Sequence, residues 1–484
     1  MPNPDDQLTN DPLSDSLSFD RHAFGPDFVW GTATAAYQIE GAVDRDGRTP
    51  SIWDTFSRQK GKIKTGETAD IACEFYDRYE SDLRLHKEMG FDSFRFSLSW
   101  SRILPEGTGP ALGGRINEAG LAFYDRLIDQ CLALGITPWI TLYHWDLPQA
   151  LENKGGWPNR NIVHWFCEFV DICTKAFGHK VKHWIILNEP LAFSVLGYFT
   201  GQHAPGRRSF RNLLPAIHHT ALAQAEGGRV VRQNVAGARV GTTFSCSPIE
   251  PFSASPRDKA AAARVDALMN RLFIEPSLGL GYPTDELPFL SGIGKKVAKH
   301  SDMERLAFDF DFIGLQHYFR AVVEHSYFMP YLWAAQVSPL RRQVPIITEM
   351  GWEVYPDSMF QIIRQFGQYE GVKKIYITES GAAFYDMVQN GKVNDMARMH
   401  YHQDYLNSVL HAKREGYPVD GYFAWTFLDN FEWAEGYRPR FGLVYVDFRT
   451  QKRIIKASGR WFQQLLTNNS AAVHDLSHMG NRFC

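Results

Sequence analysis

The stretch KIYITESG, from Lys374 to Gly381, combines four residues suited to a buried β-strand with a carboxylate, a hydroxyl and a glycine that follow directly. Burying a glutamate at the end of an apolar strand costs free energy unless its charge is paired or used in chemistry. Glu379 is therefore a candidate functional residue. The alternative is a structural glutamate that caps the next helix or pairs with an arginine.

Seven other short apolar stretches occur along the chain, and most of them also end in polar or aromatic residues. They are FVWGTA (28–33), SFRFSLSW (93–100), TPWITLY (137–143), WIIL (184–187), VGTTFS (240–245), FIGLQHY (312–318) and GYFAWT (421–426). Amphipathic segments with helical periodicity separate many of them. These segments lie at about 77–89, 117–134, 161–177, 213–234, 258–274, 356–370 and 396–415.

This alternation of near-continuous apolar strands with helices predicts a parallel sheet that is covered on both faces. Eight such units that close on themselves make an α/β fold, a single-domain (β/α)8 or TIM barrel, expected over residues 23–466. A doubly wound open sheet is the alternative, but no glycine-rich phosphate loop follows the first strand. Long connections are expected to wall a pocket at the C-terminal face of the barrel. They lie near 41–70, 191–212, 246–258 and 319–345.

The composition is that of a globular enzyme, with 484 residues of which 44% are hydrophobic and 22% charged. The chain has 51 Lys and Arg against 54 Asp and Glu, and this near-balance argues against nucleic-acid or anionic-membrane partners. Residues 1–22 and 467–484 are polar and loosely patterned, which predicts a flexible leader and a C-terminal tail. Six cysteines without CxxC spacing, and no signal-like or membrane-length apolar run, predict a cytoplasmic protein with reduced thiols.

Polar residues cluster at the ends of the predicted strands, and a barrel gathers these ends into one mouth. They are Gln38, Arg95, His144, Asn188, Glu189, Tyr318, Glu379 and Glu432. Two of the glutamates would face each other across the mouth from the fourth and seventh strands. Paired carboxylates that flank a bond are what glycoside hydrolysis requires, because one protonates the leaving oxygen while the other attacks carbon or activates water.

Five motifs resemble those of glycoside hydrolase family 1, the family of retaining β-glucosidases and β-galactosidases. They are QIEGA (38–42), HWDLP (144–148), NEP (188–190), TESG (378–381) and DNFEW (429–433). The resemblance runs from about Phe24 to Leu466, with the motifs in matching order and spacing.

The family resemblance implies an exo-acting β-glycosidase that works through a covalent glycosyl-enzyme. A β-glucosidase that releases terminal β-D-glucosyl residues from oligosaccharides or from aryl and alkyl glucosides is the first expectation. A β-galactosidase, a β-fucosidase or a broad-specificity β-glycosidase remains an alternative. The implied partner is a small-molecule β-glycoside or oligosaccharide, and no cofactor or metal is implied.

By this resemblance, Glu379 matches the family's nucleophile and Glu189 its general acid/base. Arg95 and Tyr318 match residues that hold the nucleophile, since a guanidinium favours the charged carboxylate and a phenol donates a hydrogen bond to it. Glu189 should be protonated at the start of the reaction and act as a base in the second step. In a retaining enzyme the two carboxyl groups should lie roughly 5–5.5 Å apart.

The resemblance also implies which residues bind the sugar. Asn188 is expected to bind the 2-hydroxyl, an interaction that strengthens in the transition state. The other expected contacts are Gln38, His144 and Trp433 with the 3- and 4-hydroxyls, Glu432 with the 4- and 6-hydroxyls, Trp425 beneath the ring, Phe441 at the far end, and Trp352 at the leaving-group site.

Some of these residues also have a structural interpretation. A lone histidine such as His144 would fit a hydrogen-bonded core residue, and Trp425 lies in an apolar strand where it needs no ligand. Two nearby acids, Asp146 and Glu40, are interpreted as structural and left out of the site. The tryptophans assigned to the core are Trp30, Trp100 and Trp139. The histidines without partners at metal-ligand spacing, which therefore predict no metal, are His86, His183, His218 and His219.

Two positions depart from the usual family pattern. Ser380 follows the nucleophile where asparagine is common, and its small polar side chain should have little effect on the chemistry. Gln316 stands where the family usually has the asparagine of an Asn-Tyr-Tyr motif. Its side chain is one methylene longer and should place the amide differently, so Gln316 is excluded from the predicted site.

Rival functions can be tested on the sequence. The intact Glu432-Trp433 pair argues against a phospho-β-glycosidase, because an acidic side chain would repel a 6-phosphate. Glu189 argues against a thioglucosidase, in which glutamine replaces the acid. A catalytically silent sugar-binding module is the non-enzyme alternative, but such modules typically lose one carboxylate and this chain keeps both. Glucose and galactose stay open as substrates, and a homo-oligomer is compatible with the size of the chain.

Overall fold

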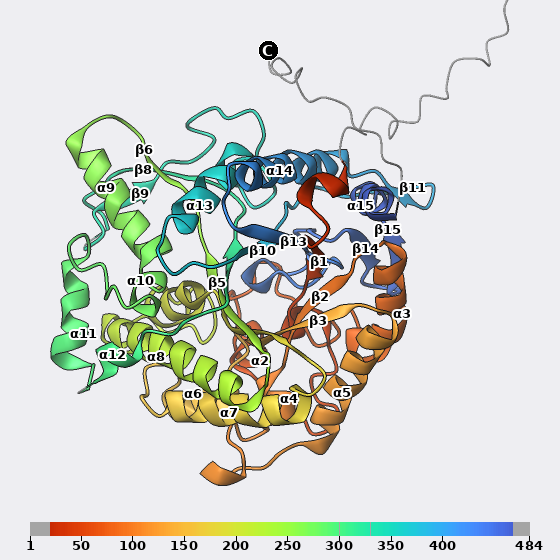
Figure 1. The fold of residues 1–484 in the computed structure, drawn as a ribbon, viewed down its shortest axis with the longest axis horizontal. Helices are drawn as coiled ribbons and strands as arrows, with labels where there is room; N and C mark the ends of the chain where they lie inside the picture. Colours follow the sequence, from red (N-terminus) through yellow and green to blue (C-terminus); the bar gives the residue numbers. More distant parts are fainter. Residues whose placement is uncertain (1–19, 300, 330, 468–484) are drawn as a thin grey trace, which may run out of the picture.

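Eight parallel strands form a closed barrel in the computed structural model of the protein, which describes residues 20–299, 301–329 and 331–467 (Figure 1). The barrel strands are β1 (Val29–Ala33), β2 (Ser93–Ser97), β3 (Thr137–Tyr143), β4 (His183–Asn188), β5 (Arg239–Ser245), β7 (Phe312–Gln316), β10 (Ile375–Ser380) and β13 (Val419–Trp425). Each predicted apolar stretch corresponds to one of these strands. The first and last strands, β1 and β13, pair in parallel and close the barrel, so the predicted (β/α)8 fold is confirmed.

Helices surround the barrel and lie close to the predicted ranges (Figure 1). The longer ones are α3 (Phe75–Glu88), α5 (Glu118–Ala133), α7 (Ile162–Phe177), α8 (Phe210–Asn234), α9 (Pro256–Asp266), α13 (Asp357–Gly367), α14 (Met396–Arg414) and α15 (Ala457–Thr467). The shorter ones are α1 (Ala36–Ile39), α2 (Ile52–Ser57), α4 (Trp100–Ile103), α6 (Gln149–Asn153), α10 (Ile274–Ser277), α11 (Ser291–Lys296) and α12 (Asp302–Arg305). Among the described residues, no helix has the length and apolar character to span a lipid bilayer.

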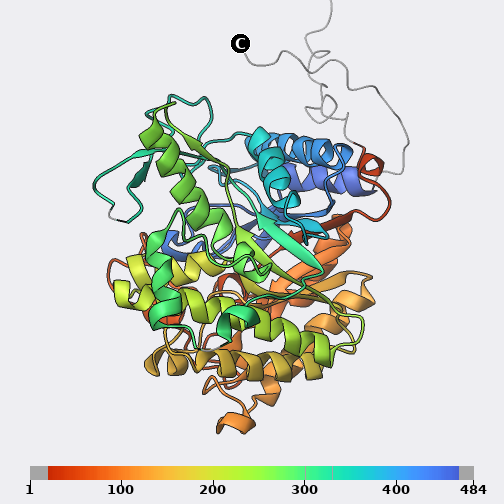
Figure 2. The same ribbon diagram turned by 60° about the vertical axis from the view of Figure 1, so that its left-hand side comes forward.

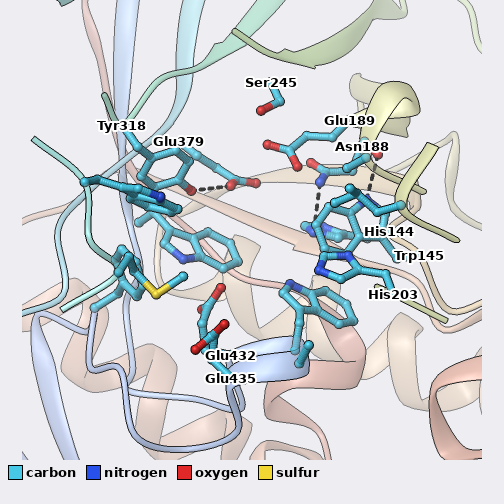
Figure 3. Close-up of a pocket in the computed structure, with 18 of the residues that line it drawn as sticks. His144, Trp145, Asn188, Glu189, His203, Ser245, Tyr318, Glu379, Glu432 and Glu435 are labelled. Atoms are coloured by element: carbon cyan, nitrogen blue, oxygen red, sulfur yellow. Dashed lines mark hydrogen bonds between the residues drawn. The ribbon is translucent and has the colours of Figure 1, made fainter. Parts of the chain in front are cut away.

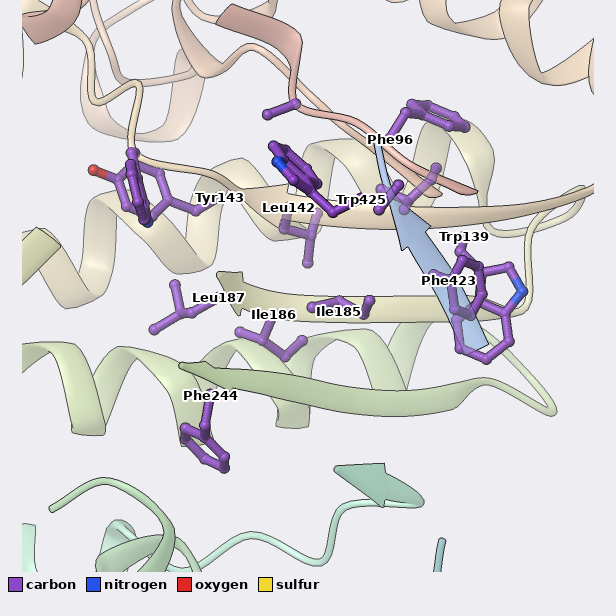
Figure 4. Close-up of a cluster of buried hydrophobic side chains, with 14 of the residues drawn as sticks. Phe96, Trp139, Leu142, Tyr143, Ile185, Ile186, Leu187, Phe244, Phe423 and Trp425 are labelled. Carbon is purple, nitrogen blue, oxygen red and sulfur yellow. The ribbon is translucent and has the colours of Figure 1, made fainter. Parts of the chain in front are cut away.

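Aromatic side chains fill the barrel at the N-terminal ends of its strands. The ring of Trp139 lies 4.9 Å from that of Tyr376, 5.1 Å from that of Phe423 and 5.4 Å from that of Phe312, measured between centroids. Figure 4 shows Trp139 and Phe423 side by side, with Trp425 further along the strands. Because these rings close one end of the barrel, a pocket can open only at the other. The three tryptophans predicted for the core, Trp30, Trp100 and Trp139, are all buried, and Trp100 packs between the barrel and the ring of Phe169 on α7.

The long connections that follow β5 and β7 form a small structure of their own. Three short strands, β6 (Ile249–Pro251), β8 (Ala321–His325) and β9 (Ala334–Gln336), make one sheet, and α9 packs against it (Figure 2). Two further antiparallel pairs lie outside the barrel: β11 (Val388–Gln389) with β12 (Lys392–Val393), and β14 (Val444–Asp447) with β15 (Lys452–Ile455). The predicted pocket-walling loops are thus partly ordered by strand pairing.

The predicted leader and tail fall mostly outside the described residues. Residues 1–19 of the leader lie outside them, while Arg21–Phe24 form a 3₁₀ turn, η3, whose N-terminus is capped by the Asp20 side chain. The predicted tail also lies outside the described residues, except for Thr467, the last residue of α15. The Arg21 guanidinium donates a 2.7 Å hydrogen bond to the carbonyl of Leu466 and joins the two ends of the described chain.

Candidate active site

A cavity of about 260 Å³ opens at the C-terminal ends of the barrel strands (Figure 3). Ten of the twelve predicted site residues line it: His144, Asn188, Glu189, Tyr318, Trp352, Glu379, Trp425, Glu432, Trp433 and Phe441. The other two, Arg95 and Gln38, are fully buried behind the cavity wall, and each donates a hydrogen bond to a carboxylate that lines the cavity. The fold therefore brings all the predicted residues to one place.

Glu379 is held by three hydrogen-bond donors, one from β2 and two from the end of β7 and the residues that follow it. The Arg95 guanidinium and the Gln316 amide each donate to its Oε1 at 2.6 Å, and the Tyr318 hydroxyl donates to its Oε2 at 2.6 Å. The carboxylate is only 4% exposed, so these donors replace water almost completely. They fix its orientation and favour its ionised form.

Gln316 corrects the sequence-based expectation, because its longer side chain does not carry the amide away from Glu379. Parallel pairing of β7 with β10 places Gln316 directly beside Glu379. Its Nε2 lies 2.6 Å from Glu379 Oε1 and 2.6 Å from Asn188 Oδ1, so one amide donates to both. Excluding Gln316 on the ground of its length was wrong, since strand register and the extra methylene together set the reach of the amide.

Glu189 lies just past the end of β4, in the same cavity as Glu379. Figure 3 shows the two carboxylates pointing toward each other. The backbone N–H of Glu189 donates to the carbonyl of Thr243 at 3.0 Å, and Ser245 lies with Glu189 in the cavity lining. Burial, and then the negative charge of Glu379, raise the pKa of Glu189 well above its ordinary value.

The two carboxyl groups differ in how strongly their surroundings oppose protonation. Burial raises the pKa of Glu379 as well, but the charge of Arg95 and the hydrogen bonds from Tyr318, Arg95 and Gln316 act against that rise. Glu189 has no comparable set of donors. Glu379 therefore loses its proton first, and Glu189 keeps its proton to higher pH.

Three residues that line the cavity have left-handed backbone conformations, which non-glycine residues rarely adopt. Their φ angles are 77° for Trp145, 47° for Glu189 and 48° for Trp433. Such conformations cost about 1–3 kcal/mol each and persist where the surrounding structure enforces them, often at functional sites. Here they aim two indole rings and one carboxyl group into the same space.

Asn188 connects Glu379's donors to His144. Its Oδ1 accepts hydrogen bonds from Arg95 and Gln316, which leaves its Nδ2 to donate to His144 Nε2 at 2.9 Å. Burial and the charge of Arg95 lower the pKa of His144 well below its ordinary value, so the imidazole is neutral. Because Nε2 accepts, Nδ1 carries the proton, and within the described chain Nδ1 has no hydrogen-bond partner.

Glu432, in the loop after β13, and Gln38, on α1, form a second polar group. The Gln38 amide donates to the carbonyl of Phe431 at 2.8 Å and reaches Glu432 Oε2 at 3.4 Å. Burial, followed by the charges of Glu379 and Glu435, raises the pKa of Glu432 to about 8. Glu432 therefore keeps its proton to a higher pH than a solvent-exposed glutamate does.

Aromatic rings form the remaining walls. The Trp433 ring packs between Trp145, at 4.6 Å, and Trp53, at 4.7 Å between centroids. On the other side, the Trp352 ring lies 5.4 Å from that of Tyr318 and 5.0 Å from that of Phe319. The walls thus present flat apolar faces next to hydrogen-bonding groups, a combination suited to sugar rings.

Several residues that line the cavity were not selected from the sequence: Trp145, Ala192, Leu196, His203, Ser245, Phe319, Met350, Ala434 and Glu435. Trp145 lies within the HWDLP motif and Ser245 ends a predicted strand, so the sequence pattern could have placed both of them at the site. The others lie on loops or irregular helices whose course the sequence pattern does not specify.

The residues interpreted as structural lie away from the cavity. Glu40 pairs with Arg102 at 3.0 Å and accepts a 2.6 Å hydrogen bond from Tyr124, all three buried. Asp146 is also buried, outside the cavity lining, and burial raises its pKa to about 7. Within the described part of the chain, no group of three His, Cys, Asp or Glu side chains is placed to hold a metal ion.

Two facing carboxyl groups in a (β/α)8 barrel, among aromatic rings and hydrogen-bonding side chains, define the glycoside hydrolase class of site. The sequence profile described as Glycosyl hydrolase family 1 matches residues 20–471. The chain belongs to this family, and the resemblance inferred from its motifs is confirmed.

Curated relatives and solved structures support the same family assignment. The chain is 42% identical over 448 residues to a 1,4-beta-D-glucan glucohydrolase of Thermotoga neapolitana, covering 92% of this chain and 98% of the relative. It is 40% identical to Beta-glucosidase A of Acetivibrio thermocellus over the same shares of the two chains. The solved family 1 b-glucosidase of Thermotoga maritima superposes with a TM-score of 0.87 at 41% identity, covering 92% of this chain and 98% of that one.

Proposed function

We propose that this protein is a retaining, exo-acting β-glucosidase that hydrolyses terminal non-reducing β-D-glucosyl residues of oligosaccharides and of aryl or alkyl glucosides. The observation that carries the proposal is the unequal pair of carboxyl groups in one cavity. Glu379 is held in its ionised form by three donors, whereas burial and the charge of Glu379 keep the proton on Glu189. These are the states that a nucleophile and a general acid need.

In the first step, Glu379 attacks the anomeric carbon while Glu189 gives its proton to the glycosidic oxygen, and the alcohol leaves. Glu379 then becomes an ester, so the charge that raised the pKa of Glu189 disappears and that pKa falls. Glu189, which has just given up its proton, therefore stays ionised and can act as a base. In the second step Glu189 takes a proton from water, which attacks the same carbon and releases the sugar and Glu379. Water supplies the proton and the hydroxyl, so both carboxyl groups return to their starting states.

The remaining side chains of the cavity would bind the hydroxyl groups and the ring of the sugar. We assign Asn188 to the 2-hydroxyl and His144 Nδ1 to a neighbouring hydroxyl as a donor. We assign Glu432 to the 4- and 6-hydroxyls as a bidentate acceptor. The spare hydrogen-bonding capacity of His144 Nδ1 and Gln38 Oε1, which have no partners in the described structure, supports this assignment. Gln38 and Trp433 would join His144 at the 3- and 4-hydroxyls. Trp425 would supply the apolar face beneath the ring, and Phe441 and Trp352 the remaining contacts.

The names of the relatives favour glucose over galactose or fucose as the cleaved sugar, since they are glucan glucohydrolases and beta-glucosidases. The predicted cytoplasmic location has some support from the five cysteines of the described residues, all of which are free thiols. A homo-oligomeric state remains a prediction from size. The predicted 23–466 catalytic unit also remains a prediction.

The nucleophile is tested by Glu379→Gly on a panel of aryl β-D-glycosides. The wild type should cleave the β-glucoside, and the variant should be inactive until formate is added, because the small anion fills the vacated space and attacks in place of the carboxylate. Glu370→Gly, which removes an exposed glutamate just before β10, is the control and should respond to formate no more than the wild type. Near-normal activity of Glu379→Gly without formate would contradict the assignment.

The general acid is tested by Glu189→Ala with two leaving groups. A dinitrophenyl glucoside needs little protonation, so it should still form and accumulate the glycosyl-enzyme, whereas an alkyl glucoside should hardly react. Because the pKa of Glu189 is raised, wild-type kcat/KM should fall only at a pH well above the ordinary glutamate range, and the variant should lose this alkaline limb. An unchanged alkaline limb in Glu189→Ala would show that another group is the acid.

A further inference from the structure

Three aromatic side chains from separate parts of the chain form an exposed aromatic platform, made of Phe210, Phe289 and Tyr331. Phe210 begins α8, Phe289 lies in the short turn η7 (Pro288–Leu290), and Tyr331 lies between β8 and β9. The rings of Phe210 and Tyr331 stack at 4.9 Å with 22° between their planes, and each lies 6.1 Å from the ring of Phe289. The platform is thus assembled by tertiary contacts and does not reflect one apolar stretch of sequence.

The platform keeps much of its apolar surface in water. Tyr331 is 54% exposed and Phe210 is 38% exposed. Contiguous exposed apolar surface is unfavourable in a soluble protein and commonly marks a binding site. Because the rings already brace one another, a ligand that covers them would not need to order them first.

A short irregular helix connects the platform to the catalytic cavity. The helix η5 (Ala192–Thr200) begins just after Glu189, and its residues Ala192 and Leu196 line the cavity. Phe199 follows Leu196 by three residues on this helix, and its ring lies 5.9 Å from that of Phe210, measured between centroids. The platform therefore continues the cavity wall that starts at Glu189.

We propose that the aromatic platform binds sugar units of a β-linked glucan chain that extends out of the cavity on the leaving-group side. This inference rests on the proposed function, because it takes Glu189 as the residue that protonates the leaving group, and η5, which follows Glu189 in the chain, lines the cavity beside it. Pyranose rings have flat C–H faces that pack on exposed aromatic rings, and the stacked pair of Phe210 and Tyr331 offers such a surface. The platform makes the enzyme prefer oligosaccharides long enough to reach it.

The test compares cello-oligosaccharides of two to five glucosyl units with 4-nitrophenyl β-glucoside, using the wild type, Tyr331→Ala and Phe210→Ala. We expect wild-type kcat/KM to rise with chain length, and each variant to lose about 2- to 10-fold for the longer chains. Hydrolysis of the aryl glucoside and of cellobiose should be unchanged, since neither substrate reaches the platform. Thermal unfolding of each variant reports whether it is folded.

Tyr79→Ala is the matched control, because Tyr79 is a partly exposed tyrosine on α3, across the barrel from α8 (Figure 1). It should leave the dependence on chain length unchanged. The proposal is overturned if Tyr331→Ala and Phe210→Ala keep the wild-type dependence, or if they lose activity equally on all substrates. It is also overturned if either variant turns a dimer into a monomer in analytical ultracentrifugation, which would make the platform a contact between two copies of the chain. Failure of the wild type to cleave the aryl β-glucoside would instead contradict the proposed function.

Discussion

Gln316 shares one amide between the two side chains on which the proposed chemistry depends. Its two N–H groups reach Glu379 and Asn188 at 2.6 Å each, so it fixes the carboxylate relative to the group assigned to the 2-hydroxyl. Arg95 contacts the same two residues from the other side of the barrel. At this scale the site is a network in which two donors orient two acceptors, and no member can move alone.

Replacing Gln316 with leucine should weaken the ionised form of Glu379. A hydrogen bond to a charged group contributes about 1.5–3 kcal/mol, so kcat/KM should fall by about 10- to 150-fold. The loss of a donor raises the pKa of Glu379, so the acid limb of the pH profile should move to higher pH. The measurement is kcat/KM for an aryl β-glucoside between pH 4 and pH 9 or thereabouts.

Gln365→Leu is the control for this prediction, because Gln365 also donates to a carboxylate, Asp266 at 2.7 Å, but outside the cavity. It should leave the acid limb in place. An acid limb that does not move in Gln316→Leu would show that the amide contributes nothing to the ionisation of Glu379.

The ends of two neighbouring strands, β10 and β13, set the relation between Glu379 and Trp425. Gly381 directly follows β10, at a point where the chain passes very close to β13. A Cβ atom on residue 381 would lie 1.9 Å from the carbonyl oxygen of Trp425. Only glycine allows this approach. The glycine of the TESG motif is thus explained by strand packing, and the close approach of the two strands brings the carboxylate of Glu379 and the indole ring of Trp425 into the lining of one cavity.

Gly381→Ala should push the ends of β10 and β13 apart and displace both side chains. Misplacement by about 1 Å can cost on the order of 100-fold in rate, so kcat should fall by at least that factor, with a lower melting temperature. Gly294→Ala adds the same methyl group where no atom lies within 4 Å of it, and it is the control. Equal kcat values for the two variants would contradict this account of the motif.

The whole molecule depends on closure between its first and last strands. Below β1, the ring of Phe24 lies 4.7 Å from that of Phe28 and 5.0 Å from that of Trp30. The neighbouring Arg21 donates to the carbonyl of Leu466 on α15, the last helix. Residues from both ends of the described chain therefore seal the bottom of the barrel, far from the cavity.

Phe24→Ala should lower the free energy of unfolding by about 3–5 kcal/mol, because it leaves a hole among buried rings. KM for an aryl glucoside should be unchanged at temperatures where the variant is folded, since the cavity lies at the opposite end. Denaturant unfolding and steady-state kinetics measure the two effects. Phe328→Ala, at a side chain that is 94% exposed, is the control and should change stability by no more than about 0.5 kcal/mol.

Local patterns in the sequence were sufficient to predict the barrel and the pair of glutamates at its mouth. Strand and helix periodicity are properties of short segments, so all eight strands could be placed without tertiary information. Glu189 and Glu379 each follow an apolar strand, and the barrel then requires them to share a mouth. The family motifs marked the same positions.

Tertiary structure alone decided the rest of the site. Gln316 and Glu379 are 63 residues apart, and only the register of β7 against β10 shows that an amide of that length reaches the carboxylate. Leu196, His203 and the aromatic platform lie on long connections, whose path depends on packing against other parts of the chain. The sequence determined which chemistry this protein carries, whereas the folded structure determined which side chains surround it, because contacts between distant segments are absent from any local pattern.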